Sequence, residues 1–335
     1  MPKKTPPPIR EVEVQRVVDE FAGGTQSVCA VAEVEGQLKF LKSQRPHAHV
    51  RYANFESEIL AHDLFEVAGI KAPEAEVVRL KKGSSLEDRL GRVVLAMDYV
   101  DSEFAGRQKV MGGAWGTRQG ADTDDYRKMI LVDILMGNAD RRGANYLDRW
   151  TRQGEVKPVP IDNNSGFGNL LNWKVPTNHC NFINSYGGAG STPGIRQNGT
   201  IANILMDTTL HQELLDEPAE QQRTLELAAE LVSRLSDEKI DDMVENLPRE
   251  IIPRGTRVRL DDVRAGLDGE GLNVLSNGVE DGLSGQNLFQ FRKDQLRHTL
   301  RWRRDHLVEA LQQFFAAADP LKQASDDWNL LSQRG

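Results

Sequence analysis

The chain has 335 residues, of which 27% are charged and 39% are hydrophobic, and its formal net charge is -8. A chain of this length can bury a substantial core, in one large domain or, as we expect, in two lobes. The composition excludes a disordered or fibrous protein, and the acidic balance argues against non-specific binding to nucleic acid. We therefore expect no direct nucleic-acid partner.

The cysteines indicate a reducing compartment. Cys29 and Cys180 are the two cysteines of the chain, and they lie far apart without metal-ligand spacing. His179 adjoins Cys180, but without a second pair at ligand spacing the sequence predicts no zinc site. No apolar segment follows the basic start of the chain, and no stretch of about 18 residues is apolar and uncharged. We predict a cytoplasmic protein without a membrane span.

The first hundred residues predict a small β-rich lobe with one helix. Residues 1–10 are Pro-rich and indicate a flexible lead-in, whereas 11–21 alternate too weakly to separate strand from helix. Gly69 stops the helix. The elements that the pattern predicts are a hairpin over 27–42 with its turn at Glu35 and Gly36, a helix over 54–68, and strands over 76–80 and 92–100.

Beyond this lobe the pattern becomes helical. Residues 168–200 are rich in Asn and Gly and lack core-forming residues, so we predict a mobile loop there that shapes the choice of substrate. The chain then divides into an N-lobe over 11–100, a C-lobe over 101–320 and a tail over 321–335. Amphipathic periodicity predicts helices over 124–136, 219–234, 237–246 and 286–316.

The densest polar signal is the segment 137–147, which a hairpin pattern connects to Asp162. If the hairpin arms pair symmetrically, the turn falls at 153–154 and Asn145 lies beside Asp162. A carboxylate and an amide oxygen are suitable magnesium ligands. Asp140 precedes Asn145 by five residues, the offset between base and amide ligand in the protein-kinase catalytic loop. The segment therefore predicts a base, Asp140, beside a metal site at Asn145 and Asp162.

Each of these residues also has an ordinary structural explanation. Asn138 and Asp140 can cap a turn after the preceding helix, and Asp162 can end a strand. Their combination with the hairpin symmetry favours catalysis.

The two segments resemble the catalytic and metal-binding segments of the HipA-like kinases, a family related to the phosphatidylinositol 3- and 4-kinases. The resemblance rests on Gly-Asn-Ala-Asp-Arg at 137–141 with Asn145, and on Ile-Asp-Asn-Asn-Ser-Gly-Phe at 161–167. It implies an α+β fold of two protein-kinase-like lobes, with ATP and Mg2+ as cofactors. A looser resemblance covers most of residues 20–316, in the segments 23–27, 36–42, 54–73, 237–248 and 303–307.

The resemblance assigns nucleotide-binding roles to the small lobe. Lys42 would bind the α- and β-phosphates, and an ion pair with Glu58 would position it. Lys39 and Glu56 are the competing candidates for these two roles. The other implied contacts are the Gly-rich loop at Gly23 and Gly24, whose backbone N–H groups would approach phosphate, and the adenine-binding hinge at Met97, Asp98, Tyr99 and Val100.

Ordinary alternatives exist here as well. A lysine at a strand end is usually a solvated charge, and its pairing with Glu58 could be a surface salt bridge. Two glycines are often a plain turn, and 97–100 could be a core strand. The basic stretch 292–304 is predicted to be an amphipathic helix with a solvated charged face, because leucines recur at 296, 300, 307 and 311.

The chain departs from the family pattern. Arg142 stands where a histidine is usual, and the metal segment reads Asp-Asn-Asn rather than Asp-Phe-Gly; neither change removes a required carboxylate. Because the chain begins almost directly at the Gly-rich segment, we expect it to lack the extra N-terminal subdomain of the HipA toxins. A toxin role with a DNA-binding antitoxin is therefore not expected, and a regulatory partner protein stays open.

The phosphate acceptor is the least determined part of the prediction. A protein, a lipid headgroup and a metabolite all offer a hydroxyl, and the closer resemblance to the HipA-like kinases favours protein Ser or Thr. The alternatives are a small-molecule or lipid kinase of the same fold, a nucleotide-binding pseudokinase and an AMP-transferring enzyme. Candidate self-phosphorylation sites are Ser27, Ser185, Ser191 and Thr192.

Overall fold

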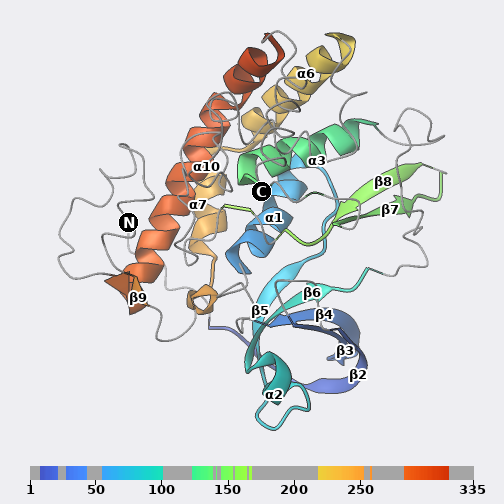
Figure 1. Ribbon diagram of the computed structural model, residues 1–335, viewed down its shortest axis with the longest axis vertical. Helices are drawn as coiled ribbons and strands as arrows, with labels where there is room; N and C mark the ends of the chain where they lie inside the picture. Colours follow the sequence, from blue (N-terminus) through green and yellow to red (C-terminus); the bar gives the residue numbers. More distant parts are fainter. Residues whose placement is uncertain are drawn as a thin grey trace, which may run out of the picture.

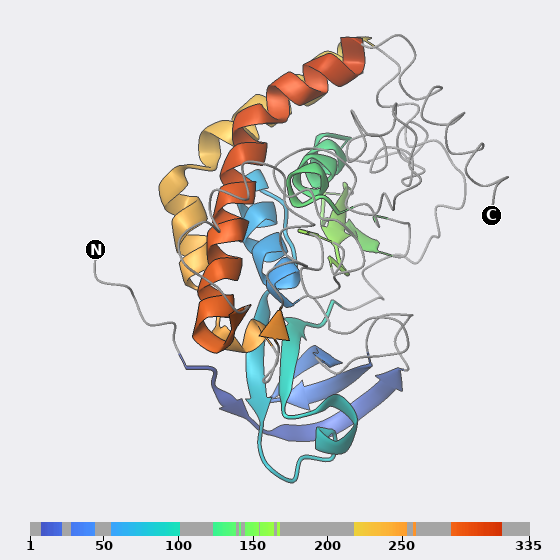
Figure 2. The ribbon, with the colours of Figure 1, turned by 60° about the vertical axis from the view of Figure 1, so that its left-hand side comes forward.

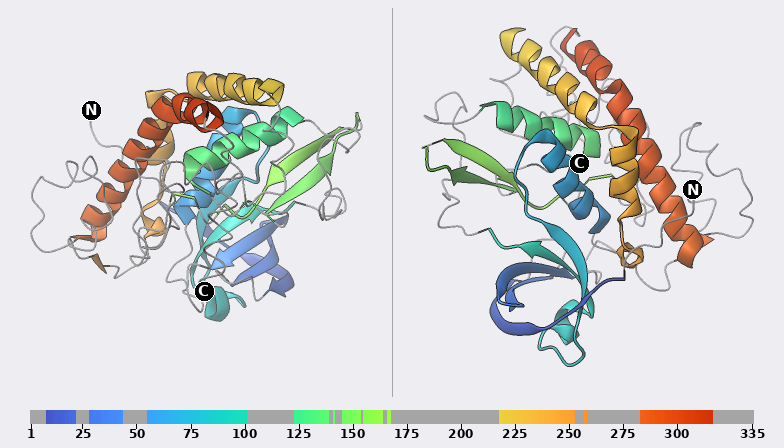
Figure 3. Two further views of the ribbon diagram at one scale, coloured as in Figure 1. Left: turned by 45° about the horizontal axis from the view of Figure 1, so that its top comes forward. Right: turned by 180° about the vertical axis from the view of Figure 1, so that it is seen from behind.

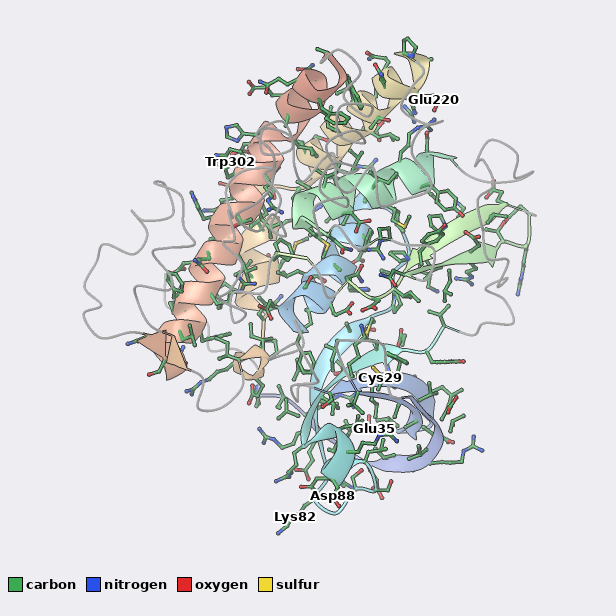
Figure 4. All side chains as sticks on the ribbon, viewed as in Figure 1. Cys29, Glu35, Lys82, Asp88, Glu220 and Trp302 are labelled. Carbon is green, nitrogen blue, oxygen red and sulfur yellow. The ribbon has the colours of Figure 1, made fainter. Side chains whose placement is uncertain are left out.

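A computed structural model shows a two-lobed molecule, with a curled β-sheet at one end and a group of helices at the other (Figure 1). Glu220, near the start of α6, lies at the end of the molecule opposite to Asp88 of the sheet lobe (Figure 4). The structure describes residues 8–21, 28–43, 55–100, 123–138, 141, 145–153, 155–163, 166–167, 218–252, 257–258 and 283–316.

The small lobe is a six-stranded sheet in the order β1-β5-β6-β4-β3-β2. Neighbouring strands are antiparallel except β1 and β5, which are parallel. The region 11–21, which the sequence left open between strand and helix, is strand. The strands are β1 (Glu11–Val12), β2 (Val14–Phe21), β3 (Cys29–Val34), β4 (Gln37–Ser43), β5 (Ala75–Leu80) and β6 (Val93–Asp98).

The predicted hairpin is confirmed as β3 and β4, with Val34 opposite Gln37. Glu35 and Gly36 form its turn with φ of 53° and 78°. Two successive positive φ values are typical of the tight turn whose twist matches that of the paired strands. The short helix α2 (Glu87–Leu90), between β5 and β6, was not predicted.

The sheet has an apolar core on each face. Along β6, Val94 and Ala96 contact the core inside the curl, whereas Leu95 and Met97 contact the core shared with the helices. This alternation follows from the two-residue period of a strand. The sheet is therefore joined to the large lobe by packing as well as by the chain.

Helix α1 (Phe55–Ala68) confirms the predicted helix and lies between the sheet and the helices of the large lobe (Figure 2). It ends at Gly69, whose φ is 78°. Ile70 N donates to Phe65 O at 2.8 Å and Gly69 N to Glu66 O at 2.9 Å, the bonding pattern of a glycine-terminated helix. Although α1 follows β4 in sequence, its buried face belongs to the helical core.

The helices of the large lobe are those that the periodicity predicts, and α6 and α10 run side by side (Figure 3). None of the helices among the described residues is long and apolar enough to cross a membrane. The elements are α3 (Thr123–Met136), β7 (Tyr146–Trp150), β8 (Val156–Pro160), α6 (Pro218–Arg234), α7 (Asp237–Glu245), η2 (Arg249–Ile251), β9 (Arg257–Val258), β10 (Leu283–Ser284) and α10 (Gly285–Ala316).

The basic face of α10 differs from its prediction. The four leucines are buried, as expected. Arg297 and Arg301, however, form ion pairs with acidic residues of α7 instead of being fully solvated. Arg301 Nη2 lies 2.7 Å from Asp241 Oδ1, and Arg297 Nη2 lies 2.5 Å from Glu245 Oε1. The prediction of a solvated face was wrong because periodicity along one helix does not show which helix packs beside it.

The architecture is thus an α+β fold of two lobes, a small lobe built on one sheet and a larger lobe that is mostly helical. The boundary predicted near residue 100 stays a prediction, because 101–122 lie outside the described residues, as does the loop 168–200. Within the predicted lead-in, Arg10 O accepts a hydrogen bond of 2.9 Å from Arg79 N.

Asp63 on α1 gives a pH-dependent prediction. Burial raises the pKa of its carboxyl group from 3.8 to about 6, and Glu66 adds to this effect while His62 opposes it. Because the folded state binds the proton more tightly than the unfolded state, the contribution of Asp63 to stability is lost as the pH rises from about 4 to about 6. Asp63→Asn should therefore raise the free energy of unfolding at pH 7 by about 1–2 kcal/mol and much less at pH 4.

Urea unfolding at the two pH values checks this expectation. The matched control is Asp242→Asn, which removes an exposed carboxylate on α7 and should leave stability unchanged at both pH values. Equal effects of the two substitutions would contradict the role of burial.

Candidate active site

Lys42 on β4 is the centre of the candidate site. Its ammonium group forms an ion pair with Glu58 Oε1 on α1 and lies 3.0 Å from Asp162 Oδ1. The side chains of Lys42 and Glu58 are 5% and 0% exposed, whereas that of Asp162 is 48% exposed. One carboxylate thus holds the lysine from inside, and the other is accessible from outside.

The charges of this cluster reinforce one another. Burial acts to lower the pKa of Lys42, but the carboxylates of Glu58 and Asp162 outweigh it and raise that pKa. The Lys42 ammonium in turn lowers the pKa of Asp162, against the opposing effect of burial. Lys42 is therefore a cation and Asp162 an anion at neutral pH.

The competing residues lie elsewhere. Lys39 Nζ pairs with Asp98 Oδ1 at 2.7 Å, because a residue three positions before Lys42 points to the other face of the strand. Glu56 pairs with Arg292 of α10 at 3.0 Å. Of the two lysines and two glutamates considered, the structure brings together Lys42 and Glu58.

The second oxygen of Glu58 binds Asn163. It accepts hydrogen bonds from the backbone N of Asn163 at 2.9 Å and from its Nδ2 at 3.1 Å. Ser57 Oγ, next to Glu58 on α1, donates to Asn163 O at 2.5 Å. The residue after Asp162 is therefore fixed against α1. The sequence showed Asn163 only as a departure from the family pattern.

Arg141 was part of the recognised motif, but no role was predicted for it. Its guanidinium is buried, and each of the five N–H groups of an arginine has a partner here. Arg141 therefore joins helix α3, the two residues that flank the open end of the β7–β8 hairpin, and Asn163. The acceptors are the Asp133 carboxylate (two bonds at 2.8 Å), Ile161 O (2.8 Å), Asn163 Oδ1 (2.5 Å) and Asn145 O.

The β7–β8 hairpin corrects the predicted register by one residue. Tyr146 pairs with Pro160, and Ile161 N donates to Asn145 O at 3.0 Å. Asn145 is therefore opposite Ile161 rather than Asp162, because the turn centres on Gln153 and not between 153 and 154. Asp162 follows the last pair with a φ of 55°, so the backbone turns there and its carboxylate meets Lys42.

The segment that the sequence predicts to be catalytic begins at the end of α3. Gly137, with φ of 69°, ends the helix, and Asn138 N donates to Asp133 O at 2.8 Å. The side chain of Asn138 also donates to Asp133 Oδ1 at 2.9 Å. Asn138 and Arg141 thus bind the same carboxylate on either side of the predicted base. Asp140 itself lies outside the described residues, as do Gly23 and Gly24.

The segment after Asp162 is packed tightly between α1 and α3. A side chain at Gly166 would collide with Ser57 Oγ and, at 2.6 Å, with Met136 Cε. Phe167 N donates to Met136 O at 2.5 Å. The glycine is therefore required by close packing, which fixes the segment independently of its hydrogen bonds.

The predicted hinge is the C-terminal end of β6, an inner strand that pairs with β4 and β5. Met97 is opposite Phe40 on β4, Asp98 N donates to Glu74 O at 3.0 Å, and Tyr99 N donates to Leu38 O at 3.3 Å. A cavity of about 1370 Å³ adjoins this end of the strand. Its lining includes Asp98, Tyr99, Val100, residues 69–74 and residues of the β7–β8 hairpin.

Two groups of oxygen and nitrogen donors could hold a cation. The carboxylate of Asp162 and the amide of Asn145 offer hard oxygen atoms of the kind that magnesium prefers, so the residues present fit that ion. On α1, ligand atoms of His62, Asp63 and Glu66 lie within 4.8 Å of one another. Nδ1 of His62 is buried without a hydrogen-bond partner among the described residues, but none of the three residues is fully buried, and we assign no metal to this second group.

No protein-family model and no curated protein matches the chain. Among solved structures, the chain is similar to the proinflammatory kinase CtkA of Helicobacter pylori, with a TM-score of 0.49 and 13% sequence identity. The similarity covers 92% of this chain and 98% of that chain. Because the likeness is this distant, function is inferred from the side chains described above.

Arg141 gives a stability prediction. Arg141→Met leaves the buried Asp133 carboxylate without its cationic partner, so the free energy of unfolding should fall by about 3–5 kcal/mol. Arg141→Lys keeps the charge but not the planar fork, and should lower it by about 1–3 kcal/mol. Urea unfolding measures both effects.

The matched control is Arg152→Met, on the exposed turn of the hairpin, which should change stability by less than about 0.5 kcal/mol. If Arg141→Met were as stable as the unchanged protein, the guanidinium would not hold these segments together. The lysine variant keeps the comparison measurable if the methionine variant does not fold.

Proposed function

We propose that this protein is an ATP-dependent phosphotransferase that acts on a Ser or Thr hydroxyl of a protein. The observation that carries the proposal is the position of Lys42, which lies between the buried carboxylate of Glu58 and the accessible carboxylate of Asp162. A buried ion pair is weak evidence for stability, and a buried charged group with a perturbed pKa beside an accessible carboxylate is a candidate for a functional site.

In this proposal, Lys42 contacts the α- and β-phosphates of ATP. Its ammonium is charged at neutral pH, as a phosphate contact requires, because the two carboxylates raise its pKa. Glu58 holds it from the opposite side and is itself held by Asn163. The hinge residues, including Tyr99 and Val100, would accommodate adenine.

Asp162 and Asn145 would hold Mg2+, which, when bound, neutralises charge on the phosphates. Arg141 supports both candidate ligands, because it binds the backbone oxygens of Asn145 and of Ile161, the neighbour of Asp162. The two ligands are thereby fixed relative to one buried group.

Asp140 would accept the proton of the acceptor hydroxyl as that oxygen bonds to the γ-phosphorus. The bond between the γ-phosphorus and the β,γ-bridging oxygen breaks, and ADP leaves. Asn138 and Arg141, which flank this position in the sequence, are both buried and bind Asp133. The segment that carries the base is therefore anchored on both sides.

Protein Ser or Thr is proposed as the acceptor because the catalytic segments resemble the HipA-like kinases more closely than the lipid kinases. A small metabolite or lipid hydroxyl is the second candidate within the same reaction. Phosphopeptide mapping after incubation with MgATP distinguishes them, since ATP consumption without a modified protein residue would indicate a small acceptor.

The reaction can be tested by intact mass after incubation with MgATP. We expect a phosphate increment, whereas an AMP increment would indicate nucleotide transfer. Lys42→Met, Asp140→Asn and Asp162→Asn should each lower the rate by about 10²-fold or more, because each removes a charge used in the transition state.

Lys39→Met compares the competing lysine of the same strand. Because Lys39 pairs with the hinge residue Asp98 and lies away from Glu58 and Asp162, this variant should lower the rate much less than Lys42→Met. An unchanged rate in Asp140→Asn, or a loss confined to Lys39→Met, would contradict the assignment. No mass change and no ATP consumption by the unchanged protein would favour a nucleotide-binding pseudokinase.

A further inference from the structure

Asn163 lies between two charged groups of opposite sign that come from different parts of the chain. The residue is 2% exposed. Nδ2 donates to Glu58 Oε2 at 3.1 Å, and Oδ1 accepts from Arg141 Nη2 at 2.5 Å. One amide therefore connects the glutamate that holds Lys42 to the arginine that holds the catalytic segment.

The chemistry of this position requires an amide. The side facing Glu58 must donate, because an ionised carboxylate only accepts, and the side facing Arg141 must accept, because a guanidinium only donates. An ionised aspartate would repel Glu58, and a leucine would satisfy neither neighbour. The orientation of the amide is fixed by these partners.

Glu58 depends on this contact more than α1 does. The helix is also fixed by the buried Glu56–Arg292 pair at 3.0 Å and by the hydrogen bond from Ser57 Oγ to Asn163 O. Loss of the Asn163 side chain therefore leaves α1 in place. It removes one of the two hydrogen bonds to Glu58 Oε2, whose partner oxygen binds Lys42.

We propose that Asn163 is a positioning residue that aligns Lys42 with the catalytic segment. Through its hydrogen bond to Glu58, Asn163 fixes the position of the Lys42 ammonium. Through its hydrogen bond to Arg141, which also binds Asn145 O and Ile161 O, it fixes that position relative to these two residues. The inference rests on the proposed function and deepens it, since it names how the phosphate-binding lysine of one lobe is aligned with the candidate metal ligands of the other.

The partners of position 163 make an isosteric substitution a sharp test. Asn163→Asp keeps the size of the side chain and the acceptor for Arg141. It replaces the donor toward Glu58 by a carboxylate oxygen, which repels Glu58.

We therefore expect Asn163→Asp to lower kcat by about 10²-fold, the loss that a misplaced group of about 1 Å produces. The KM for ATP should change less, because adenine is held elsewhere. Asn163→Leu should also lower kcat, whereas the control Asn246→Asp, on an exposed cap of α7, should leave it unchanged.

The outcome that overturns the proposal is an Asn163→Asp enzyme that keeps kcat, or that loses activity only in proportion to the fraction of unfolded protein. Urea unfolding of the same variants separates these cases. A merely structural role would lower stability and leave the kcat of the folded protein unchanged.

A second measurement does not need activity. The rate at which an amine-acylating reagent modifies Lys42 is followed by mass spectrometry of its peptide. Asn163→Leu should raise that rate about tenfold, the factor expected for losing a buried hydrogen bond to a charged group. An unchanged rate would overturn the proposal even if the protein transfers no phosphate, in which case the proposed function fails separately.

Discussion

Burial of the Arg141 guanidinium demands an acceptor for each of its five N–H groups, since a buried cation without partners costs several kcal/mol. The chain supplies these acceptors from helix α3, from both ends of the β7–β8 hairpin and from Asn163. Three segments that are separate in sequence, helix α3, Asn145 and residues 161–163, must therefore take fixed positions around one group. The candidate base and metal ligands lie in these same segments, so their arrangement is a consequence of satisfying one arginine.

Helix α1 transmits this arrangement to the small lobe. Its apolar face belongs to the helical core, and its Glu56 is paired with Arg292 in the interior. Glu58 on the same helix then reaches Lys42 across the lobes. A rotation of α1 that separated Glu58 from Lys42 would have to break two buried ion pairs and expose part of the core. The lysine contact is therefore a built-in property of the fold rather than of one loop conformation.

Local pattern predicted most elements of the fold, including the helix at 54–68, the hairpin at 27–42 and the long helices of the large lobe, because each depends on periodicity and on its turn residues. The side-chain contacts that form the candidate site could not be predicted from the sequence in the same way. Nothing in the sequence near Arg141 or Asn163 shows that they bond to one another. The hairpin register was wrong by one residue because a turn of several residues allows neighbouring alignments that the apolar pattern alone does not separate.

The one-residue difference explains how Asp162 reaches Lys42. As the residue after the last hairpin pair, Asp162 is free of the ladder and adopts a φ of 55°, a region that aspartate tolerates better than most residues. The conformation is less favourable than an extended one, and its neighbours hold it: Lys42 binds the carboxylate, and Glu58 and Arg141 bind the next residue. A strained residue fixed from both sides is typical of functional sites. Pairing of Asp162 with Asn145 would have kept Asp162 in the ladder, whereas in the observed register the ladder ends before Asp162, whose carboxylate faces the lysine.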